Sequence, residues 1–542
     1  MKGSIIQYLL LSQFYFLLLF THAQGDNPKF VIGPTQESVF SDIMLAYLGT
    51  YEGNYITLHQ ENVGRASYIF SLQARDTQTL AITQTRKLES LRRLNYAHVS
   101  STSEGIFIHF TTQEKRKKDP VYKVDFSQLS LVKEERPDKP FQRKKDFVPI
   151  PADVTIRFPS TTYKDQKESL FKGECILCGA TSGEINYGDE LPRFNMSFIL
   201  TWPRLITEDL KLYEIDIFNP RDKKPIIDIA KIEVTTTNLK DDSEEKFSLE
   251  VDEHYLYRPK IIRSSDNQLS LAGLYSLTDH NNWNTGIFFM TIDLTQKKII
   301  YQVFHPFSRT LIRQFMSEES ILNREKYLKK KELDPDAHLG IDDLIIQRVI
   351  VRENGDISLI SEQYKEVVKT ITEWKDDPFS DRSRMQTREE TDYYAAHILV
   401  TTFSPVGDLR WQTVVKQKQR FEPDERRYAH FSLAFDGDDL HFVFNDRIEN
   451  DTLAPDDVPK TYRPYGLADK IVSTYVRVDE KGAKTRKVLF KRKDALVDLN
   501  PGIFFQPSTK ALVIFATIRP MGLLATRNRK TVLNRFVKIY LD

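Results

Sequence analysis

The sequence contains little cysteine, tryptophan or glycine, and it has no excess of charge of either sign. Of its 542 residues, 2 are Cys, 4 are Trp and 21 are Gly. Lys and Arg number 77 against 76 Asp and Glu, which leaves a formal net charge of +1. A balanced charge provides no long-range field to attract nucleic acid, so no nucleic-acid partner is expected.

Long apolar runs are also scarce, with one exception at the N-terminus. Residues 5–20 are mostly apolar, Lys2 precedes them, and Thr21-His22-Ala23 follows with small residues. This pattern predicts a signal peptide over residues 1–23, with an uncleaved anchor as the alternative. No later stretch approaches the ~20 apolar residues that a membrane-spanning helix needs. The mature chain is therefore expected to have no membrane span and to be periplasmic, at the cell surface or secreted.

The two cysteines lie close together, at Cys175 and Cys178. A Cys-x-x-Cys pair can be a redox centre or half of a zinc site. Zinc needs further ligands, and the sequence offers neither a second Cys pair nor a close His pair. We interpret the two as structural cysteines, with a local disulfide as one form that they could take.

Recognisable catalytic and cofactor motifs are missing. The sequence has no Gly-x-Ser-x-Gly elbow, phosphate loop, dinucleotide fingerprint or His-Glu-x-x-His motif, so no cofactor is expected. Asp436-Gly437-Asp438-Asp439 has the carboxylate density of a calcium loop but not the ligand spacing of an EF-hand. We interpret it as a hairpin turn and expect no metal site.

Short aromatic and β-branched runs separated by turn residues are what the sequence does contain. Residues 393–403 are followed by a turn at 404–408 and a second run at 409–415, and runs at 431–435 and 440–444 flank the turn at 436–439. This is the pattern of antiparallel hairpins in series. It recurs at 267–303, 355–415, 440–490 and 511–541, at spacings of roughly 40 to 90 residues.

Recurrence of this kind predicts an all-β fold, a β-propeller-like array of antiparallel blades, with tandem β-sandwiches as the alternative. Residues 24–133 are expected to form N-terminal blades, and 154–542 the further repeats. Residues 134–153, rich in Pro and charge, are predicted to be a linker or long loop. One amphipathic helix is predicted at 317–333, with acidic residues early and lysines late. The charged stretch 374–390 is predicted to be a loop.

The second half of the chain resembles an uncharacterised family of exported β-propeller-like proteins of Bacteroidetes bacteria. The resemblance covers Tyr257 to Asp542 and rests on one combined string of motifs. These are Ala272-Gly273-Leu274-Tyr275 with Ile292-Asp293, Ser361-Glu362-Gln363-Tyr364, Ile398 to Trp411 followed by Lys418-Gln419, and Phe444-Asn445-Asp446. The resemblance implies a periplasmic or surface propeller and supplies no catalytic residues.

Polar residues at the ends of predicted strands are the candidates for ligand binding. These are Glu362, Gln363, Asn445 and Asp446, because strand ends meet at the rim or mouth of a propeller. The alternative is that these groups hold neighbouring blades together. Trp283 follows a polar stretch and is expected to be an exposed ligand contact.

These observations favour a non-enzymatic binding or scaffold protein of the cell envelope over an enzyme. Its partner would be an envelope protein or a glycan. An exported hydrolase that acts on glycans or peptides with carboxylates at the propeller mouth is the alternative, and a calcium-dependent module is a third hypothesis. The sequence does not indicate the oligomeric state.

Overall fold

The structure of the protein is a computed structural model. It describes residues 28–541 apart from 40–42, 65–66, 89–90, 92–93, 103–104, 113–119, 134–173, 176–179, 182–203, 207–210, 219–229, 239–242, 252–253, 266, 279–282, 353, 377–382, 423–424, 426–427, 455–456, 465 and 519–530. The predicted signal peptide, the predicted linker at 134–153 and Cys178 therefore lie outside the described residues, as does the side chain of Cys175.

Four antiparallel sheets come from the first part of the chain. Sheet 1 contains β3 (Ile43–Tyr51), β4 (Asn54–Gly64), β5 (Ser67–Asp76) and β6 (Ile82–Leu88). Sheet 2 contains β7 (Leu94–Thr102), β8 (Gly105–Thr112), β9 (Val121–Asp125) and β10 (Ser130–Lys133). Sheet 3 contains β13 (Arg204–Ile206), β14 (Lys211–Phe218), β15 (Ala230–Asn238) and β16 (Glu244–Val251). Sheet 4 contains β17 (Tyr255–Ser265), β18 (Gln268–Ser276), β20 (Gly286–Asp293) and β21 (Lys298–Pro306).

Three further sheets follow, and the last takes in the N-terminal strands. Sheet 5 contains β23 (Leu344–Val351), β24 (Ile357–Asp376), β25 (Ser383–Phe403), β26 (Leu409–Val415) and β27 (Gln419–Phe421). Sheet 6 contains β28 (Ser432–Asp436), β29 (Asp439–Arg447), β30 (Ile471–Val478) and β31 (Lys484–Lys491). Sheet 7 contains β32 (Val497–Ser508), β33 (Ala511–Ile518), β34 (Thr531–Tyr540), β1 (Phe30–Ile32) and β2 (Gln36–Val39).

Two strand pairs and five short helices complete the described elements. The pairs are β11 (Glu174–Cys175) with β12 (Ala180–Thr181), and β19 (Trp283–Asn284) with β22 (Ile341–Asp342). The helices are α3 (Arg309–Ile312), α4 (Glu318–Lys330), α5 (Pro335–His338), the 3-10 helix η4 (Ile448–Asn450) and α6 (Arg492–Ala495).

In sheets 1, 4 and 6 the fourth strand is more exposed than the second and third strands. In sheet 1, β3 is buried over most of its length, whereas β6 is exposed except at Leu88. In sheet 4, β18 and β20 are almost wholly buried, whereas the residues of β21 are exposed or partly exposed. Such an exposed fourth strand is typical of propeller blades. The predicted all-β, propeller-like fold is confirmed.

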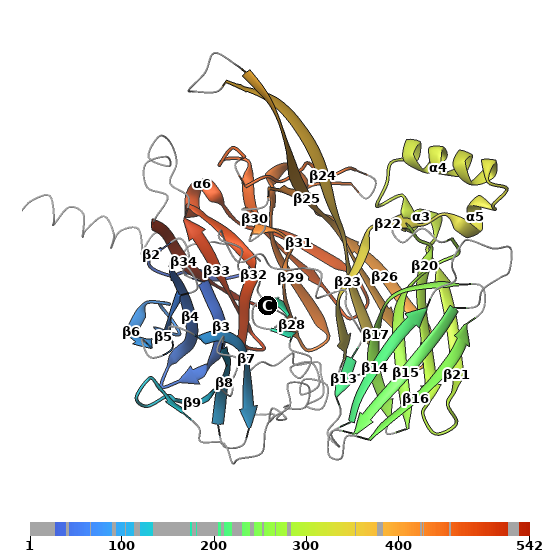
Figure 1. Ribbon diagram of the computed structural model, residues 1–542. Coiled ribbons are helices and arrows are strands. Elements are labelled where there is room, and N and C mark those ends of the chain that lie inside the picture. Colours follow the sequence, from blue (N-terminus) through green and yellow to red (C-terminus); the bar gives the residue numbers. More distant parts are fainter. Residues whose placement is uncertain are drawn as a thin grey trace, which may run out of the picture.

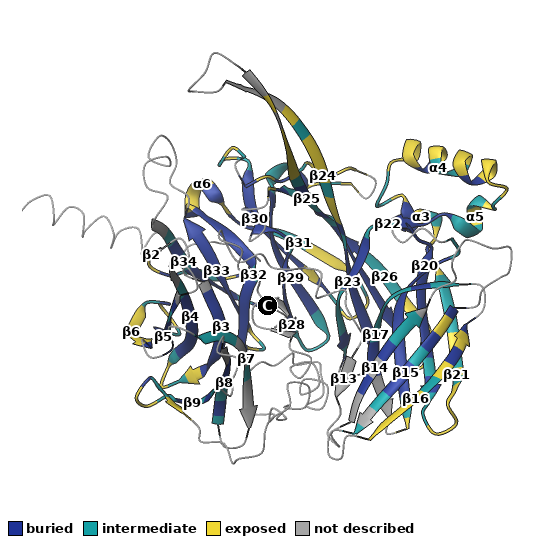
Figure 2. Ribbon diagram, viewed as in Figure 1, coloured by how far each residue is buried: buried dark blue, intermediate teal, exposed yellow. Residues whose placement is uncertain are grey.

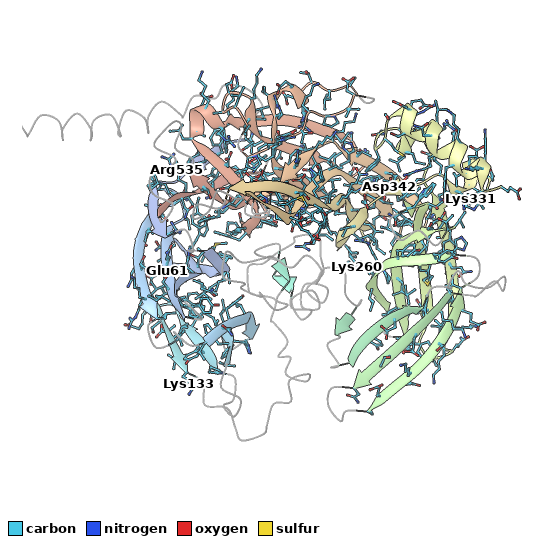
Figure 3. The ribbon with its side chains drawn as sticks, turned by 45° about the horizontal axis from the view of Figure 1, so that its top comes forward. Glu61, Lys133, Lys260, Lys331, Asp342 and Arg535 are labelled. Carbon is cyan, nitrogen blue, oxygen red and sulfur yellow. The ribbon has the colours of Figure 1, made fainter. Side chains whose placement is uncertain are left out.

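Neighbouring sheets share apolar cores, and these cores follow one another from sheet to sheet. One core joins sheets 1, 2 and 7, and others join sheet 7 to 6, 6 to 5, 5 to 4 and 4 to 3. The sheets accordingly follow an arc, from the N-terminal sheets through sheet 7 to sheet 3 (Figure 3). Residues 134–203, which connect sheets 2 and 3, lie almost wholly outside the described residues.

The two ends of the chain are joined in sheet 7. Phe30–Ile32 pairs with Val537–Ile539, and Gln36–Val39 pairs with Thr531–Asn534. The N-terminal strands thereby become the outer strands of a sheet whose other strands come from the last 46 residues of the chain. Main-chain hydrogen bonds thus join strands from opposite ends of the sequence in one sheet, as in the ring closure of propellers.

Connections differ at the two ends of the sheets. At one end, tight turns join the first strand to the second and the third to the fourth, for example at 52–53, 436–439 and 479–483. The other end, which we call the loop face, has the connections at 307–343, 416–431 and 448–470 and the tip of β24–β25. The helices and the β24–β25 hairpin gather at this end in Figure 1.

The predicted helical insertion is present on the loop face as α4. Ser317 caps its N-terminus through a hydrogen bond from the backbone N–H of Ser320, and Glu318 and Glu319 lie in its first turn. Ile321 and Leu328 are fully buried, and Ile321 belongs to the core between sheets 4 and 5. Because Pro335 opens a further short helix, α5, the insertion is longer than predicted.

The expectation of a charged loop at 374–390 is wrong for most of that stretch. β24 and β25 pair continuously from Tyr364–Ala395 to Asp376–Ser383, so both strands extend far beyond the rest of sheet 5. The two-stranded extension, which we call the ribbon, projects from the loop face (Figure 1). Its charges do not prevent strand formation because backbone hydrogen bonds hold a hairpin whose side chains face solvent.

Replacing Leu512 by Ala tests the importance of the cores between sheets. Leu512 is fully buried in β33, in the core that joins sheets 6 and 7. The substitution should lower the free energy of unfolding by about 2–5 kcal/mol, because it removes buried methyl groups and leaves a cavity. Leu467→Ala is the matched control, since Leu467 is 73% exposed and its truncation should cost less than about 0.5 kcal/mol. Denaturant unfolding measures both, and equal effects would contradict the assignment of this core.

Candidate functional site

Glu362 lies in β24 at the foot of the ribbon and is fully buried. Its Oε2 accepts hydrogen bonds from Nε2 of Gln347 at 2.9 Å and is 2.6 Å from Nδ1 of His430. Its Oε1 accepts a bond of 2.8 Å from Nε2 of Gln417. The carboxylate is thus surrounded by three side chains from three segments, which compensates for its removal from water.

Local irregularities in two strands accompany these contacts. Pairing between β23 and β24 slips at Gln347, and pairing between β24 and β25 slips at Gln363. A bulge changes the direction of neighbouring side chains, and bulges are common beside functional sites. The side chain of Gln363 donates a hydrogen bond to the backbone oxygen of Asp342 at 3.1 Å. This bond connects β24 to β22.

His430 belongs to the connection between sheets 5 and 6 and is held by its backbone. Its φ is +67°, which is in the left-handed region. The side chain of Gln419 accepts from its N–H at 2.9 Å and donates to its carbonyl oxygen at 3.4 Å. Non-glycine residues held in this conformation are concentrated at functional sites. The imidazole lies 5.3 Å from the Tyr364 ring, and 21% of the His430 side chain is exposed.

Asn445 connects sheets 6 and 7. Its Nδ2 donates to the carbonyl oxygens of Leu499 at 2.8 Å and Tyr428 at 3.3 Å, and its Oδ1 accepts from the N–H of Leu499 at 3.1 Å. Gln419 donates to the Asn445 carbonyl oxygen at 2.9 Å. Such contacts are those of a residue that holds two sheets together, which was the alternative interpretation from the sequence.

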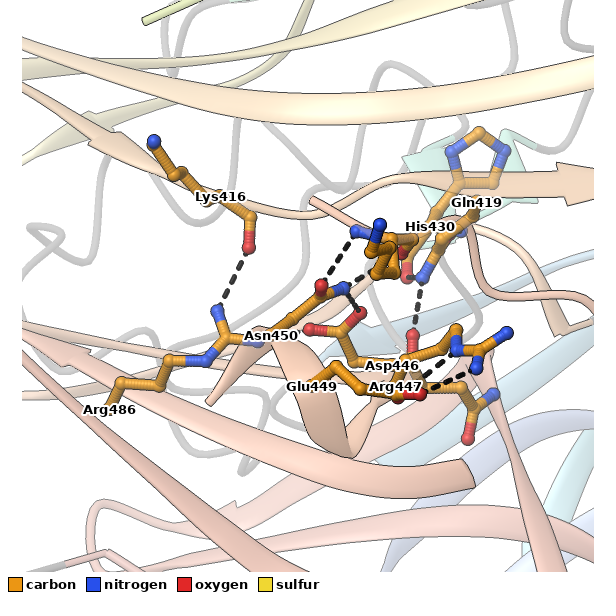
Figure 4. Close-up of polar contacts among 10 residues, drawn as sticks. Lys416, Gln419, His430, Asp446, Arg447, Glu449, Asn450 and Arg486 are labelled. Atoms are coloured by element: carbon orange, nitrogen blue, oxygen red, sulfur yellow. Dashed lines mark hydrogen bonds and ion pairs between the residues drawn. The ribbon is translucent and has the colours of Figure 1, made fainter. Parts of the chain in front are cut away.

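Asp446, the next residue, is also fully buried and forms an ion pair with Arg486 (Figure 4). Asn450 donates to its Oδ1 at 2.7 Å and exchanges bonds of 2.7 and 2.8 Å with the backbone of Lys460. Arg486 also donates to the Lys416 carbonyl oxygen at 2.9 Å. This network fixes the connection at 448–470 to the outer strand of sheet 6. For Asn445 and Asp446, ligand binding stays a prediction.

Trp283 is buried, so the expectation of an exposed tryptophan is wrong. Only 8% of its surface is accessible, and the guanidinium of Arg324 lies 4.3 Å from its ring centroid. Arg324, from α4, also pairs with Asp342 at 2.5 Å. The polar residues that precede Trp283 in sequence suggested exposure, but α4 packs over it, a contact between segments about 40 residues apart.

His397 lies on β25 close to the carboxylate network and is also buried. Burial lowers its pKa to about 3, and the nearby charges of Lys416, Lys418 and Lys484 act in the same direction. The ring of Phe315 contacts it edge-on at 5.3 Å. A neutral, buried imidazole of this kind fits a structural role better than proton exchange with a ligand.

The expected hairpin turn at 436–439 is confirmed, because Asp436 pairs with Asp439 at the ends of β28 and β29. The two carboxylates face different cations, Lys510 and Arg477 respectively. Within the described part of the chain, no three His, Cys, Asp or Glu side chains are grouped so that they could hold a metal ion. No described helix is long and apolar enough to span a membrane.

Glu362 was named from the sequence, but its partners were not. His430 is 68 positions away and Gln417 is 55 positions away. Neither forms a motif with Glu362, and a lone His or Gln between strands carries no spacing signal. Only the positive φ of His430 marks it as unusual, and that is a property of the folded backbone.

No family model matches this chain, and no curated protein matches it. Among solved structures, it is similar to the β-propeller domain of the Trilobed protease from Pyrococcus furiosus, at 8% identity and a TM-score of 0.31, over 92% of this chain and 94% of that one. RS223-Beta-xylosidase matches at 9% identity and a TM-score of 0.22, over 63% of this chain and 92% of that one. An α-L-arabinofuranosidase from Lactobacillus brevis matches at 9% identity and a TM-score of 0.22, over 62% and 89%. At such identities no activity transfers to this chain.

The buried carboxyl of Asp446 should make stability depend on pH. Burial raises its pKa from 3.8 to about 6, against the opposing effect of Arg486. Between these pH values the folded protein keeps a proton that the unfolded chain has released, so this group lowers stability as pH rises. The melting temperature of Asp446→Asn, minus that of the wild type, should therefore increase between pH 4 and pH 6.

Glu449→Gln provides a control of opposite sign. A hydrogen bond from Arg447 lowers the pKa of Glu449 from 4.5 to about 2. Its contribution to stability is present above about pH 4.5 and is lost as pH falls toward 2, so the difference for this variant should become more negative as pH rises through that window. A flat difference for Asp446→Asn between pH 4 and pH 6 would contradict the raised pKa.

Proposed function

We propose that this protein is an exported binding or scaffold protein of the cell envelope, and that the ribbon on its loop face holds a protein partner. The observation that carries this proposal is the length and exposure of the ribbon, whose described residues are mostly exposed (Figure 2). The apolar N-terminal segment supports export. The binding role needs no catalytic step.

One face of the ribbon combines exposed apolar and uncharged side chains. Val368 is 61% exposed, and Met385, nearer the tip, is 62% exposed. Thr370, Thr372, Thr387 and one charged residue, Glu389, lie between them, because cross-strand partners and residues two apart in a strand share a face. The opposite face has charged residues, including Lys369 and Glu390. A partner therefore meets a face with few charges on one side and a face with more charges on the other.

An isolated two-stranded ribbon is only marginally stable in water, so a ribbon of this length gains much from a partner. Among the described residues, β24 pairs only with β25 beyond Gln363, which leaves an open strand edge. Open edges are used for strand addition by extended peptide segments. A long two-stranded ribbon offers an extended surface, which favours a protein over a glycan as the partner.

The foot of the ribbon is anchored, so force on the ribbon would reach the sheets. β27 pairs with β25 at Tyr393–Ala395, and Asp392 forms ion pairs with Lys369 and Arg420. Arg420 also links the ribbon to the 448–470 connection, because its backbone N–H donates a hydrogen bond to the Tyr462 carbonyl oxygen at 3.0 Å. Helix α4 is less suited to be the main contact, since its buried residues belong to the core.

A hydrolase that works with carboxylates at the propeller mouth receives less support. Glu362 and Asp446 are both fully buried, and their oxygens are engaged by neighbouring side chains. A carboxylate pair in a glycosidase must flank the bond that it cleaves. The effect of neutralising either residue on stability must therefore be measured together with its effect on any reaction.

Val368→Glu tests the ribbon as a binding surface. The tagged mature protein is crosslinked in its native cells and recovered, and its partner is identified and then purified for titration. The charge at the ribbon face should weaken binding about tenfold or more, as loss of an important interface contact does. Val406→Glu is the matched control, because Val406 is 63% exposed in a tight turn at the opposite end of sheet 5.

Both variants should melt within a few degrees of the wild type, since neither position is buried. Equal binding by the wild type and Val368→Glu would contradict the ribbon as the contact surface. Equal weakening by both substitutions would contradict it too, because the effect would then be one of charge alone. Recovery of a glycan and no protein would contradict a protein partner and would support a glycan as the ligand.

A further inference from the structure

The hydrogen bonds around Glu362 determine which nitrogen of His430 holds the hydrogen. Gln347 and Gln417 reach the carboxylate through their Nε2 atoms, as amide donors. The Gln417 orientation is determined independently, because its Nε2 also donates to the Ala396 carbonyl oxygen at 3.0 Å. Glu362 is thus an acceptor for all of its neighbours. Nδ1 of His430, 2.6 Å from Oε2, therefore donates its hydrogen to the carboxylate.

A neutral imidazole that donates through Nδ1 has a lone pair on Nε2. Among the residues that the structure describes, none forms a hydrogen bond to Nε2 of His430. The side chain is 21% exposed, whereas that of Glu362 is completely covered. The pair therefore presents one basic nitrogen to the outside and keeps its carboxylate inside. A carboxylate at Nδ1 also stabilises the imidazolium that forms when Nε2 takes up a proton.

A second acceptor borders the same carboxylate. Oε1 of Gln417 is buried and has no hydrogen-bond partner among the described residues. It cannot turn toward Glu362, because the amide Nε2 already occupies that side. An unmatched buried acceptor is costly unless a water or a ligand donor reaches it. The surroundings of Glu362 thus favour hydrogen-bond donors such as water.

We propose that His430 is a catalytic general base, oriented by Glu362, that activates water against an ester. Nε2 takes a proton from water as the water oxygen bonds to the acyl carbon. The bond from the acyl carbon to the leaving oxygen then breaks, and the imidazolium returns its proton to that oxygen. The products are a carboxylic acid and an alcohol, and no oxidant, reductant or metal takes part.

An ester fits better than a glycoside because the site offers one accessible base and no accessible pair of carboxylates. The dyad also lies at the foot of the ribbon. Tyr364, whose ring is 5.3 Å from the imidazole, stacks at 6.5 Å on Tyr393 of the opposite strand. A partner that lies along the ribbon would bring its chain close to Nε2. The reaction itself does not depend on that partner.

His430→Gly is the informative variant, because glycine adopts a φ of +67° without strain and should preserve the fold. The full mature chain is assayed with p-nitrophenyl acetate and p-nitrophenyl butyrate. His430→Gly should lower the rate by about 100-fold, the usual contribution of a general base. After the hydrolysis caused by imidazole in buffer alone is subtracted, added imidazole should restore part of the rate to this variant and not to the wild type, because the deleted ring leaves room for it.

His338→Gln is the matched control for a partly exposed histidine. His338 also has its Nδ1 in a hydrogen bond, at 2.9 Å, but to the backbone oxygen of Asp334 rather than to a carboxylate. Its substitution should leave the ester rate unchanged. If His430→Gly hydrolyses both esters as fast as the wild type, or if His338→Gln loses as much activity, the proposal is wrong.

Glu362 is a positioning residue in this proposal, and its role has a spectroscopic signature. Nitrogen-15 NMR of the histidine ring distinguishes the form with hydrogen on Nδ1 from the form with hydrogen on Nε2. The wild type should show the hydrogen on Nδ1 of His430. Glu362→Gln should shift the ring toward the form with hydrogen on Nε2, and it should lower the rate of ester hydrolysis. A wild-type ring with hydrogen on Nε2 would overturn the proposal whatever the variant does to stability.

Discussion

The burial of apolar sheet faces against neighbouring sheets is the constraint on which this structure depends. A four-stranded sheet of apolar strands cannot cover its own faces, so the sheets must pack on one another. The shared cores meet this need in sequence, from sheet 2 through sheets 1, 7, 6, 5 and 4 to sheet 3. Pairing of β1 and β2 with β34 joins the two ends of the chain within this series.

The same constraint leaves tight turns at one end of the sheets and longer connections on the loop face. Turns between strands of one sheet can be short at the end where nothing else is built. At the other end, the chain supports a helical insertion, the ribbon and the connections at 416–431 and 448–470. His430 and Glu362 meet there, because one comes from a connection and the other from the adjoining strand of sheet 5.

Strand identity was predictable over most of the described chain, as β18, β20 and β29 show, because aromatic and β-branched runs between turn residues carry their own signal. The ribbon was not predictable, since its charged strands read as a loop. Trp283 was misjudged for a related reason: sequence neighbours indicate local polarity, whereas α4, about 40 residues later, decides its burial.

The sequence by itself determined the all-β class, the recurring hairpins and the helix at 317–333, because these depend on periodicity and capping among near neighbours. It also singled out Glu362 as a polar residue at the end of an apolar strand run. Only the tertiary structure decided what that residue does. Its contacts come from Gln347, Gln417 and His430 on separate segments, and the direction of each hydrogen bond follows from folded geometry rather than from spacing along the chain.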